Sequence, residues 1–392
     1  MEITKIKRYF LERGMLAFYA VFVAGYFLMP MASGHRRLYF ILVFPAVLFL
    51  FKELRQFYRA NALFLLVVIY ASYMMTTLLW SDNFSAQGAA WALWNSVNAL
   101  SFCFVTGFLW VHHHQKMDAL AHKAIWIAAA VALTSIVMWY IDHPFPGNRL
   151  QPLGVMHHEN KAAAAYGIFL ILAIHYLLNE PDNPNKFYYL LPALIIFALV
   201  ALSQSRTAMA GVFAGLLVLL GWRAIIIVVA GLAVNWFLLA ANQAYWVDRV
   251  ATFSFRPGIW QSVIDNMQGH WLLGHGYLVN EEVQAYGRVF NHAHNSYLAS
   301  LRDGGLAGLT LMLAFLGLAL WWSVRLYREQ GNRIYLALLL YSMTCIAMDF
   351  DRLLTAPKEL WLYFWLPIGL IMAAYPNARS KASELDYDKA KI

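Results

Sequence analysis

Charged side chains are scarce in this sequence: they make up 13% of its 392 residues, whereas 61% of the residues are hydrophobic and 16% are aromatic. No soluble domain needs that much apolar surface, so the composition excludes the soluble globular class. The mean hydropathy of +0.54 is typical of a polytopic membrane protein.

Cysteine is nearly absent, and both Cys103 and Cys345 fall inside apolar segments. This excludes a disulfide framework and argues against a metal site built from thiolates. The sequence also lacks internal repeats and low-complexity runs, and no small-residue cleavage site follows its basic N-terminus. We therefore predict a retained first helix and a single transmembrane domain over residues 1–392.

The long hydrophobic runs have the length that crosses a bilayer, about 17–25 residues. They predict an all-α, polytopic integral membrane protein of about twelve transmembrane helices with a helical loop on the outer side. The predicted spans are 15–32, 38–51, 61–80, 94–111, 122–141, 161–178, 187–203, 207–221, 224–241, 305–324, 333–349 and 359–375.

The formal net charge of +8 does not indicate a nucleic-acid partner, because the basic residues lie in loops between the spans. There they act as topology signals. With the N-terminus inside, eighteen of the 29 Lys and Arg residues fall on the inner side and eleven on the outer side. We therefore predict that both termini are inside, with a polar tail over residues 376–392.

Two segments on the predicted outer side are long, at residues 141–160 and 242–303. The second is too rich in aromatic and aliphatic side chains for a flexible linker. We predict that it folds back on the membrane as short helices and covers the single domain.

The stretch from His294 to Gly308, HNSYLASLRDGGLAG, lies where this outer loop meets the next span. As one helix, it places His294, Gly305 and Gly308 on one face, where glycines let a neighbouring helix pack closely. Asp303-Gly304-Gly305 fits equally well as the end of a short surface helix before the span. His294 is then either a titratable group for chemistry or an interfacial side chain without a chemical role.

Two outer arginines lie at expected helix starts. Arg256 precedes Pro257, and proline suits the first helical position. Arg206 lies between Ser205 and Thr207, either of which would cap the following span. Such a pair suits a diphosphate, because helix N-termini favour anions and arginine holds phosphate oxygens with two donors. The alternative is that each arginine pairs with lipid headgroups at the interface.

A second polar cluster lies just before a span, in the segment 148–161. It contains Arg149, His157, His158, Glu159, Asn160 and Lys161. Adjacent histidines point apart and no spaced third ligand lies nearby, which disfavours zinc. A polar re-entrant turn that lines the site is the preferred interpretation.

Any of eight outer carboxylates would orient His294, and the sequence does not choose among Asp248, Asp265, Glu281, Glu282, Asp303, Asp349, Asp351 and Glu359. Asp349-Phe350-Asp351 also fits a divalent metal on a diphosphate, although Arg352 would compete as the counter-ion. His292 is expected to face away from His294 on a helix. Gly274-His275-Gly276 is expected to form a turn.

These motifs resemble those of the bacterial O-antigen ligases (WaaL type), within the wider Wzy-like group of O-antigen ligases, polymerases and related oligosaccharyltransferases. The shared pattern is His294-Asn295, nine residues and Gly305-Leu306-Ala307-Gly308, together with Ser205-Arg206-Thr207, Arg256 four residues before Trp260, and the stretch from Arg149 to Asn160. That stretch departs from the group, which often has proline where this chain has Glu159.

The resemblance implies a GT-C-like fold whose outer loop is periplasmic. It also implies a metal-independent, cofactor-free, inverting glycosyltransferase in the bacterial inner membrane, with a periplasmic active site. The donor would be an O-antigen glycan on undecaprenyl diphosphate, and the acceptor a sugar hydroxyl of lipid A–core, completing lipopolysaccharide. Asp349 and Asp351 would then pair with arginines. His294 would be the general base, Arg206, Arg256 and Arg149 would bind the diphosphate, and Asn295, Asn160, Lys161, Arg302, Gly305 and Gly308 would support them.

Three other functions remain open from the sequence. An O-antigen polymerase would use the same donor, as would a protein O-oligosaccharyltransferase, although those tend to be longer. A lipid or solute transporter belongs to another class, but it favours charges near mid-membrane and repeated halves.

Overall fold

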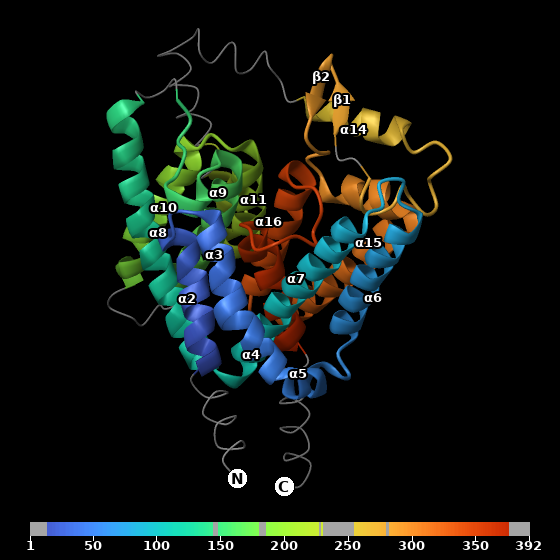
Figure 1. Cartoon of the computed structure of the whole chain (residues 1–392). Helices are drawn as coiled ribbons and strands as arrows, with labels where there is room; N and C mark the ends of the chain where they lie inside the picture. Colours follow the sequence, from blue (N-terminus) through green and yellow to red (C-terminus); the bar gives the residue numbers. More distant parts are fainter. Residues whose placement is uncertain are drawn as a thin grey trace.

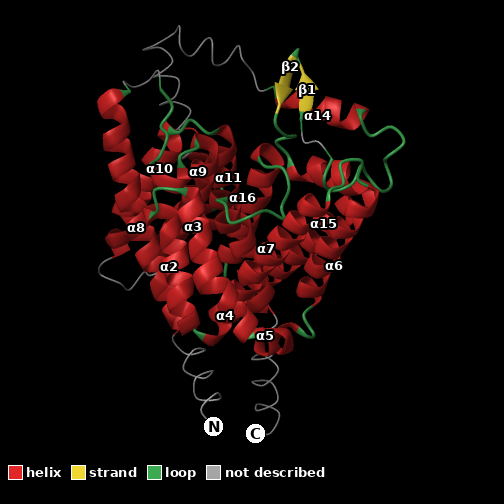
Figure 2. Cartoon of the chain, viewed as in Figure 1, coloured by secondary structure: helices red, strands yellow, loops and turns green. Residues whose placement is uncertain are grey.

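The computed structural model describes residues 14–143, 148–179, 186–226, 229, 255–279 and 282–375. These residues are mostly helical, as Figure 2 shows. The long helices pack side by side as one body, and residues 256–265 and 283–290 lie at one end of it (Figure 1).

Helices fill the first part of the chain. They are α2 (Met15–Leu28), α3 (Ala32–Leu38), the π-helical turn η2 (Tyr39–Val43), α4 (Phe44–Phe49), α5 (Phe51–Tyr58), α6 (Ala62–Thr76), the 3-10 turn η3 (Thr77–Trp80), α7 (Ala86–His112) and α8 (His114–Asp142).

The second part contains the site described below. Its elements are η4 (Gly154–Met156), α9 (Glu159–Asn179), η5 (Lys186–Tyr189), α10 (Leu190–Leu202), α11 (Arg206–Leu220), α14 (Arg256–Asp265), β1 (Val283–Ala285), β2 (Arg288–Phe290), α15 (Ser296–Gln330), α16 (Ile334–Asp349) and η6 (Trp361–Trp365), after which the helix continues to Tyr375.

Side-chain caps set where several helices begin. The Asn61 side chain accepts a hydrogen bond from the third residue of α6, and Ser85 and Ser205 do the same for α7 and α11. Asn295 accepts from the backbone N–H groups of Tyr297 and Leu298 at the start of α15. Each cap satisfies backbone donors that the first turn leaves without an intrahelical partner.

Within the described residues, five helices are long and apolar enough to cross a membrane: Ala62–Trp80, Ala86–His112, His114–Asp142, Glu159–Asn179 and Ser296–Gln330. Shorter apolar helices occupy Met15–Leu28, Leu190–Leu202, Arg206–Leu220, Ile334–Asp349 and Trp361–Tyr375. The predicted membrane class is confirmed, and the count of twelve spans stays a prediction. The span predicted at 224–241 lies largely outside the described residues.

Helix α16 lies in the middle of the second part, where it packs against α11, α9 and α15. Its Tyr341 donates a hydrogen bond to the Ala164 carbonyl, 2.6 Å away, and is fully buried. A Cβ at Gly167 or Gly211 would lie 2.2 or 3.1 Å from the Tyr341 side chain. The missing side chains therefore let three helices approach closely, which fixes the position of Asp349 at the end of α16.

The stretch after His294 is not one helix, so the prediction of a single shared face is wrong. Gly305 has φ of 63° and ψ of −163°, which breaks α15 into a short helix and a long one. The N–H groups of Leu306 and Ala307 instead donate to the carbonyls of Trp271 and Leu272. The alternative, a short helix that ends at Asp303-Gly304-Gly305, is confirmed.

The glycines of this stretch still allow close packing. A Cβ at Gly308 would lie 3.2 Å from the Met74 sulfur, and one at Gly304 would lie 2.8 Å from it, so α6 approaches here. The predicted turn at Gly274-His275-Gly276 is also confirmed, and its amides at His275 and Gly276 donate to the carbonyls of Arg302 and Asp303.

The described part of the outer loop is not purely helical, which corrects the prediction of a helical loop, whereas the described residues as a whole are mostly helical as predicted. Strands β1 and β2 form an antiparallel hairpin that pairs Val283 with Phe290 and Ala285 with Arg288. The side chains of β1 alternate between buried and exposed, as expected for a hairpin with only one face packed. That face packs against α14. Ile259 and Val263 of α14 pack with Val283 and Ala293 in a small second core.

We expect Gly305→Ala to destabilise the protein by about 2 kcal/mol or more. The observed φ and ψ lie in a region that glycine alone occupies readily, and an added Cβ would lie 2.3 Å from the Leu272 backbone. Thermal unfolding of the purified protein in detergent measures the loss. Gly317→Ala is the matched control. Gly317 lies in the same helix, and a Cβ added there would meet no atom within 4 Å. Equal unfolding temperatures for both variants would contradict the expectation.

Candidate functional site

His294 lies at the turn between the hairpin and α15, immediately before the Asn295 cap. Its φ of 49° turns the backbone, and its Nδ1 lies 3.0 Å from Oδ1 of Asp349 at the end of α16. A carboxylate accepts hydrogen bonds, so Nδ1–H donates to Asp349, and in the neutral form of the ring Nε2 carries the lone pair. The His294 side chain is 29% exposed and Asp349 only 8%, so a substrate can reach the imidazole but not the carboxylate.

Arg256 approaches the same carboxylate from α14. Its Nη2 lies 3.9 Å from Asp349 Oδ1 and donates a hydrogen bond to Thr207 Oγ1, 3.1 Å away. Burial lowers the pKa of Arg256; Asp349 opposes this effect, and nearby Arg206 adds to it. Arg256 of α14 therefore lies between the end of α16, at Asp349, and the start of α11, at Thr207.

Arg206 is the first residue of α11 and is exposed. The Ser205 side chain accepts a hydrogen bond from the Ala208 N–H, which confirms one of the two predicted caps. Arg256 likewise begins α14, with Pro257 next to it. Both predicted helix starts are confirmed, and the two guanidinium groups are close enough to repel each other electrostatically. Two adjacent cations at helix N-termini form a region suited to an anion.

The prediction that His292 faces away from His294 is wrong, because neither residue is in a helix. The turn at His294 brings the two rings together, with 4.0 Å between their centroids. The His294 backbone N–H donates to His292 Nδ1, 3.1 Å away. Burial lowers the pKa of His292 from 6.5 to about 4, and the neighbouring His294 contributes to this. A neutral His292 thus supports the backbone and ring of His294.

Asp351 lies two residues after Asp349 but has different partners. Arg302 donates two hydrogen bonds to the Asp351 carboxylate, at 3.3 and 3.1 Å, and one to Asp303 at 2.7 Å. Arg352 also donates to Asp303. Burial raises the pKa of Asp351, but Arg302 and Arg352 outweigh it and hold the pKa below its ordinary value. This four-charge network ties the start of α15 to the segment after α16.

The two aspartates therefore serve separate partners, His294 and Arg302. Across the described part of the chain, no three His, Cys, Asp or Glu side chains form a group that would hold a metal ion. The pairing of Asp349 and Asp351 with arginines matches the expectation from the resemblance, while metal independence stays a prediction.

Arg149 connects the segment before α9 with the end of α10. Its Nη1 lies 2.8 Å from Glu159 Oε1, its Nη2 donates to Asn160, and its Nε donates to the Ser203 carbonyl at 3.0 Å. The Nζ atom of Lys161 lies 5.8 Å from the centre of the Phe350 ring, and Phe350 directly follows Asp349 in the sequence. Arg149 thus holds the two segments that precede α9 and α11, and its role as a diphosphate ligand stays a prediction.

The structure divides the predicted site residues among separate contacts. His294 and Arg256 both approach Asp349, Arg302 binds Asp351, and Arg149 binds Asn160. Two functional contacts were missed by sequence reasoning, those of Thr207 and His292. Thr207 follows Arg206 directly, so its presence beside a helix start was the available signal; no signal marks His292.

The chain matches a known family model and a known protein. Residues 191–313 match the family model described as O-antigen ligase, and this segment contains Arg206, Arg256 and His294. The chain is also similar to an O-antigen ligase of Pseudomonas aeruginosa (strain PAO1), with 27% identity over 363 residues. That match covers 91% of this chain and 89% of that protein. The resemblance predicted from the motifs is thereby confirmed.

The depressed pKa of His292 predicts a pH dependence of stability. In the unfolded chain His292 titrates near 6.5, whereas in the folded protein it titrates near 4. Folding stability should therefore be full above pH 6.5, fall by about 3 kcal/mol as the pH drops toward 4, and level off below that.

The comparison is with His292→Asn, whose side-chain oxygen keeps an acceptor for the His294 N–H but does not titrate in this range. Unfolding temperatures of both proteins between pH 7 and pH 4 test the expectation. The wild type should lose more stability than the variant, and parallel curves would show that His292 is not the responsible group.

Proposed function

We propose that this chain is an O-antigen ligase, which transfers an O-antigen glycan from undecaprenyl diphosphate to a sugar hydroxyl of lipid A–core on the periplasmic face of the inner membrane. The observation that supports this best is one oxygen atom, Asp349 Oδ1, which lies 3.0 Å from His294 Nδ1 and 3.9 Å from Arg256 Nη2. It joins a base to a region that attracts anions.

His294 acts as the general base. As the acceptor oxygen forms a bond to C1 of the donor sugar, its proton moves to His294 Nε2. The bond between C1 and the diphosphate oxygen breaks, and its electron pair leaves on the diphosphate. A sugar hydroxyl is far less acidic than imidazolium, so the proton moves late in this step. Attack from the face opposite the leaving group inverts C1.

Asp349 supports the base in two ways. It holds Nδ1–H of His294, which leaves Nε2 unprotonated and aimed by a fixed ring. When the ring takes up the proton, the buried carboxylate stabilises the imidazolium that forms. His292 accepts a hydrogen bond from the His294 N–H and supports the ring from the other side.

Arg206 and Arg256 neutralise the leaving diphosphate. Both lie in the first turn of a helix, where backbone N–H groups add to their positive charge. Negative charge grows on the leaving group during bond breaking, and fixed cations stabilise that state without rearrangement. In our proposal these arginines do the work that a divalent metal does in many other glycosyltransferases.

Replacement of either His294 or Asp349 should slow glycan transfer without unfolding the protein. His294→Ala removes the base and should lower kcat by about 10²–10⁴-fold. Asp349→Asn keeps the shape but not the charge, and should cost about 10²-fold or more. A reconstituted assay with lipid-linked glycan and rough lipopolysaccharide measures both. Asp265→Asn, exposed on α14 beside Gln261, is the matched control and should keep wild-type activity.

The same variant separates this proposal from its rivals in cells. With His294→Ala, lipid-linked polymer should accumulate while attachment to lipid A–core stops. Failure to form long chains at all would favour the polymerase, and failure of lipid-linked glycan to reach the periplasm would favour the transporter.

Conservative changes at the two arginines test the anion site. Arg206→Lys and Arg256→Lys keep the charge but lose the planar pair of donors, so each should lower kcat/KM for the donor by about 10–10²-fold. Steady-state kinetics with varied donor concentration measure the change. Arg325→Lys is the control, because Arg325 is an exposed partner of Glu329 on α15. Unchanged kinetics in both arginine variants would rule out their contact with the diphosphate.

A further inference from the structure

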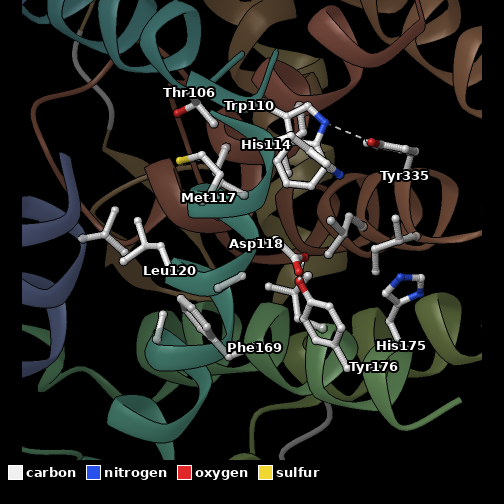
Figure 3. A pocket seen from close by; sticks show the side chains of 18 of the residues that line it. Thr106, Trp110, His114, Met117, Asp118, Leu120, Phe169, His175, Tyr176 and Tyr335 are labelled. Carbon is white, nitrogen blue, oxygen red and sulfur yellow. Dashed lines mark hydrogen bonds between the residues drawn. The ribbon is translucent and has the colours of Figure 1, made fainter. Parts of the chain in front are cut away.

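A second region of the molecule has the features of a binding site, and the proposed reaction does not use it. It is a cavity of about 210 Å³ beside Ile334 at the start of α16, whereas His294 binds Asp349 at the end of the same helix. The two ends of α16 are about 22 Å apart at 1.5 Å per residue. Figure 3 shows most of the side chains that line the cavity.

The deep walls of the cavity are apolar. They come from α2, α7, α8, α9, α16 and the last helix, and include the buried side chains of Val23, Phe169, Leu338 and Leu370. Walls of this kind favour an occupant that buries apolar surface against them. The occupant must therefore have an apolar part that reaches between the helices.

Helix α8 provides the clearest view of how polarity changes along the cavity. His114, Asp118 and Ala121 line it at spacings of four and three residues, so they share one face, and Ala124 continues the wall one turn deeper. The polar residues are at the end of the helix and the small apolar ones lie further in. A larger side chain at Ala121 would occupy the space that the alanine leaves.

The neighbouring helices repeat this order. On α9, His175 and Tyr176 lie near the end of the helix, and Phe169 lies two turns deeper. At α16, Asn332 precedes the helix and Leu338 lies within it. Three helices thus place polar groups at the mouth and apolar groups inside, which is the order of polarity in a membrane lipid from headgroup to acyl chain.

Asp118 gives the mouth its charge. Its Oδ1 accepts a hydrogen bond from the Tyr176 hydroxyl at 2.6 Å, and its Oδ2 lies 3.1 Å from His122 Nε2. These contacts fix the carboxylate in place, yet its side chain remains 38% exposed. Each carboxylate oxygen has a second lone pair, so Asp118 can still accept a hydrogen bond from a cation.

We propose that this cavity binds one acyl chain of a phospholipid whose headgroup carries an ammonium group, as phosphatidylethanolamine does. The chain lies along Ala121 and Ala124, and the ammonium pairs with Asp118. The phosphate accepts hydrogen bonds from the Asn332 amide and from the imidazoles at the mouth. The site holds a membrane lipid at the opposite end of the bundle from His294, so it is separate from the donor site.

Native mass spectrometry of the full chain, purified in mild detergent with equal amounts of phosphatidylethanolamine and phosphatidylglycerol, tests the site. The wild type should retain one phosphatidylethanolamine molecule. Ala121→Trp fills the cavity and should reduce retention by about tenfold or more. Ala130→Trp, the same change at an exposed position of α8, should retain the lipid. Retention by Ala121→Trp at the wild-type level would overturn the proposal.

Asp118→Asn tests the headgroup without altering the cavity volume. It should remove the preference for phosphatidylethanolamine over phosphatidylglycerol, because the amide is neutral. Equal retention of both lipids by the wild type would overturn the assignment of the headgroup. If Ala121→Trp unfolds at a lower temperature than Ala130→Trp, the headgroup preference in the wild type and Asp118→Asn decides the matter alone.

Discussion

One carboxylate oxygen connects the parts of this molecule that the proposed chemistry requires. Asp349 Oδ1 binds the ring of His294 and lies within ion-pair distance of Arg256, whose guanidinium contacts Thr207 on α11. The imidazole gains a fixed orientation from this arrangement, and the arginine is kept near the base. Because Asp349 is almost fully buried, water does not weaken either interaction as it would at the surface.

That oxygen is placed by helix packing far from the chemistry. Tyr341 of α16 packs against Gly167 and Gly211, and these contacts fix the position of α16 between α9 and α11. The Arg302 network then secures the loop that carries the next carboxylate, Asp351, so that it does not compete for His294. Apolar packing and a buried charge network therefore act together. The packing of α16 fixes the position of Asp349, and the charge network keeps Asp351 away from His294, so that Asp349 alone binds the imidazole.

The sequence was most informative where the signal is local. Ser205 before Arg206, and Pro257 after Arg256, mark helix starts within a few residues, and both starts are where the pattern places them. The choice of Asp349 among eight carboxylates could not be made, because it is 55 residues from His294 and depends on where α16 ends. The contact with His292 was missed for another reason: it depends on a positive φ at His294, and a positive φ is uncommon for any residue other than glycine.

The break at Gly305 bears on how the chain is assembled in the membrane. Two amides of α15 depend on carbonyls of residues 271 and 272, and an amide left without a partner in lipid costs several kcal/mol. Those carbonyls are synthesised about 35 residues before the amides that donate to them, so they can already be in place when the long part of α15 enters the bilayer. We therefore expect the loop to be synthesised before the span that follows it, so that the loop carbonyls can accept hydrogen bonds from that span as it inserts.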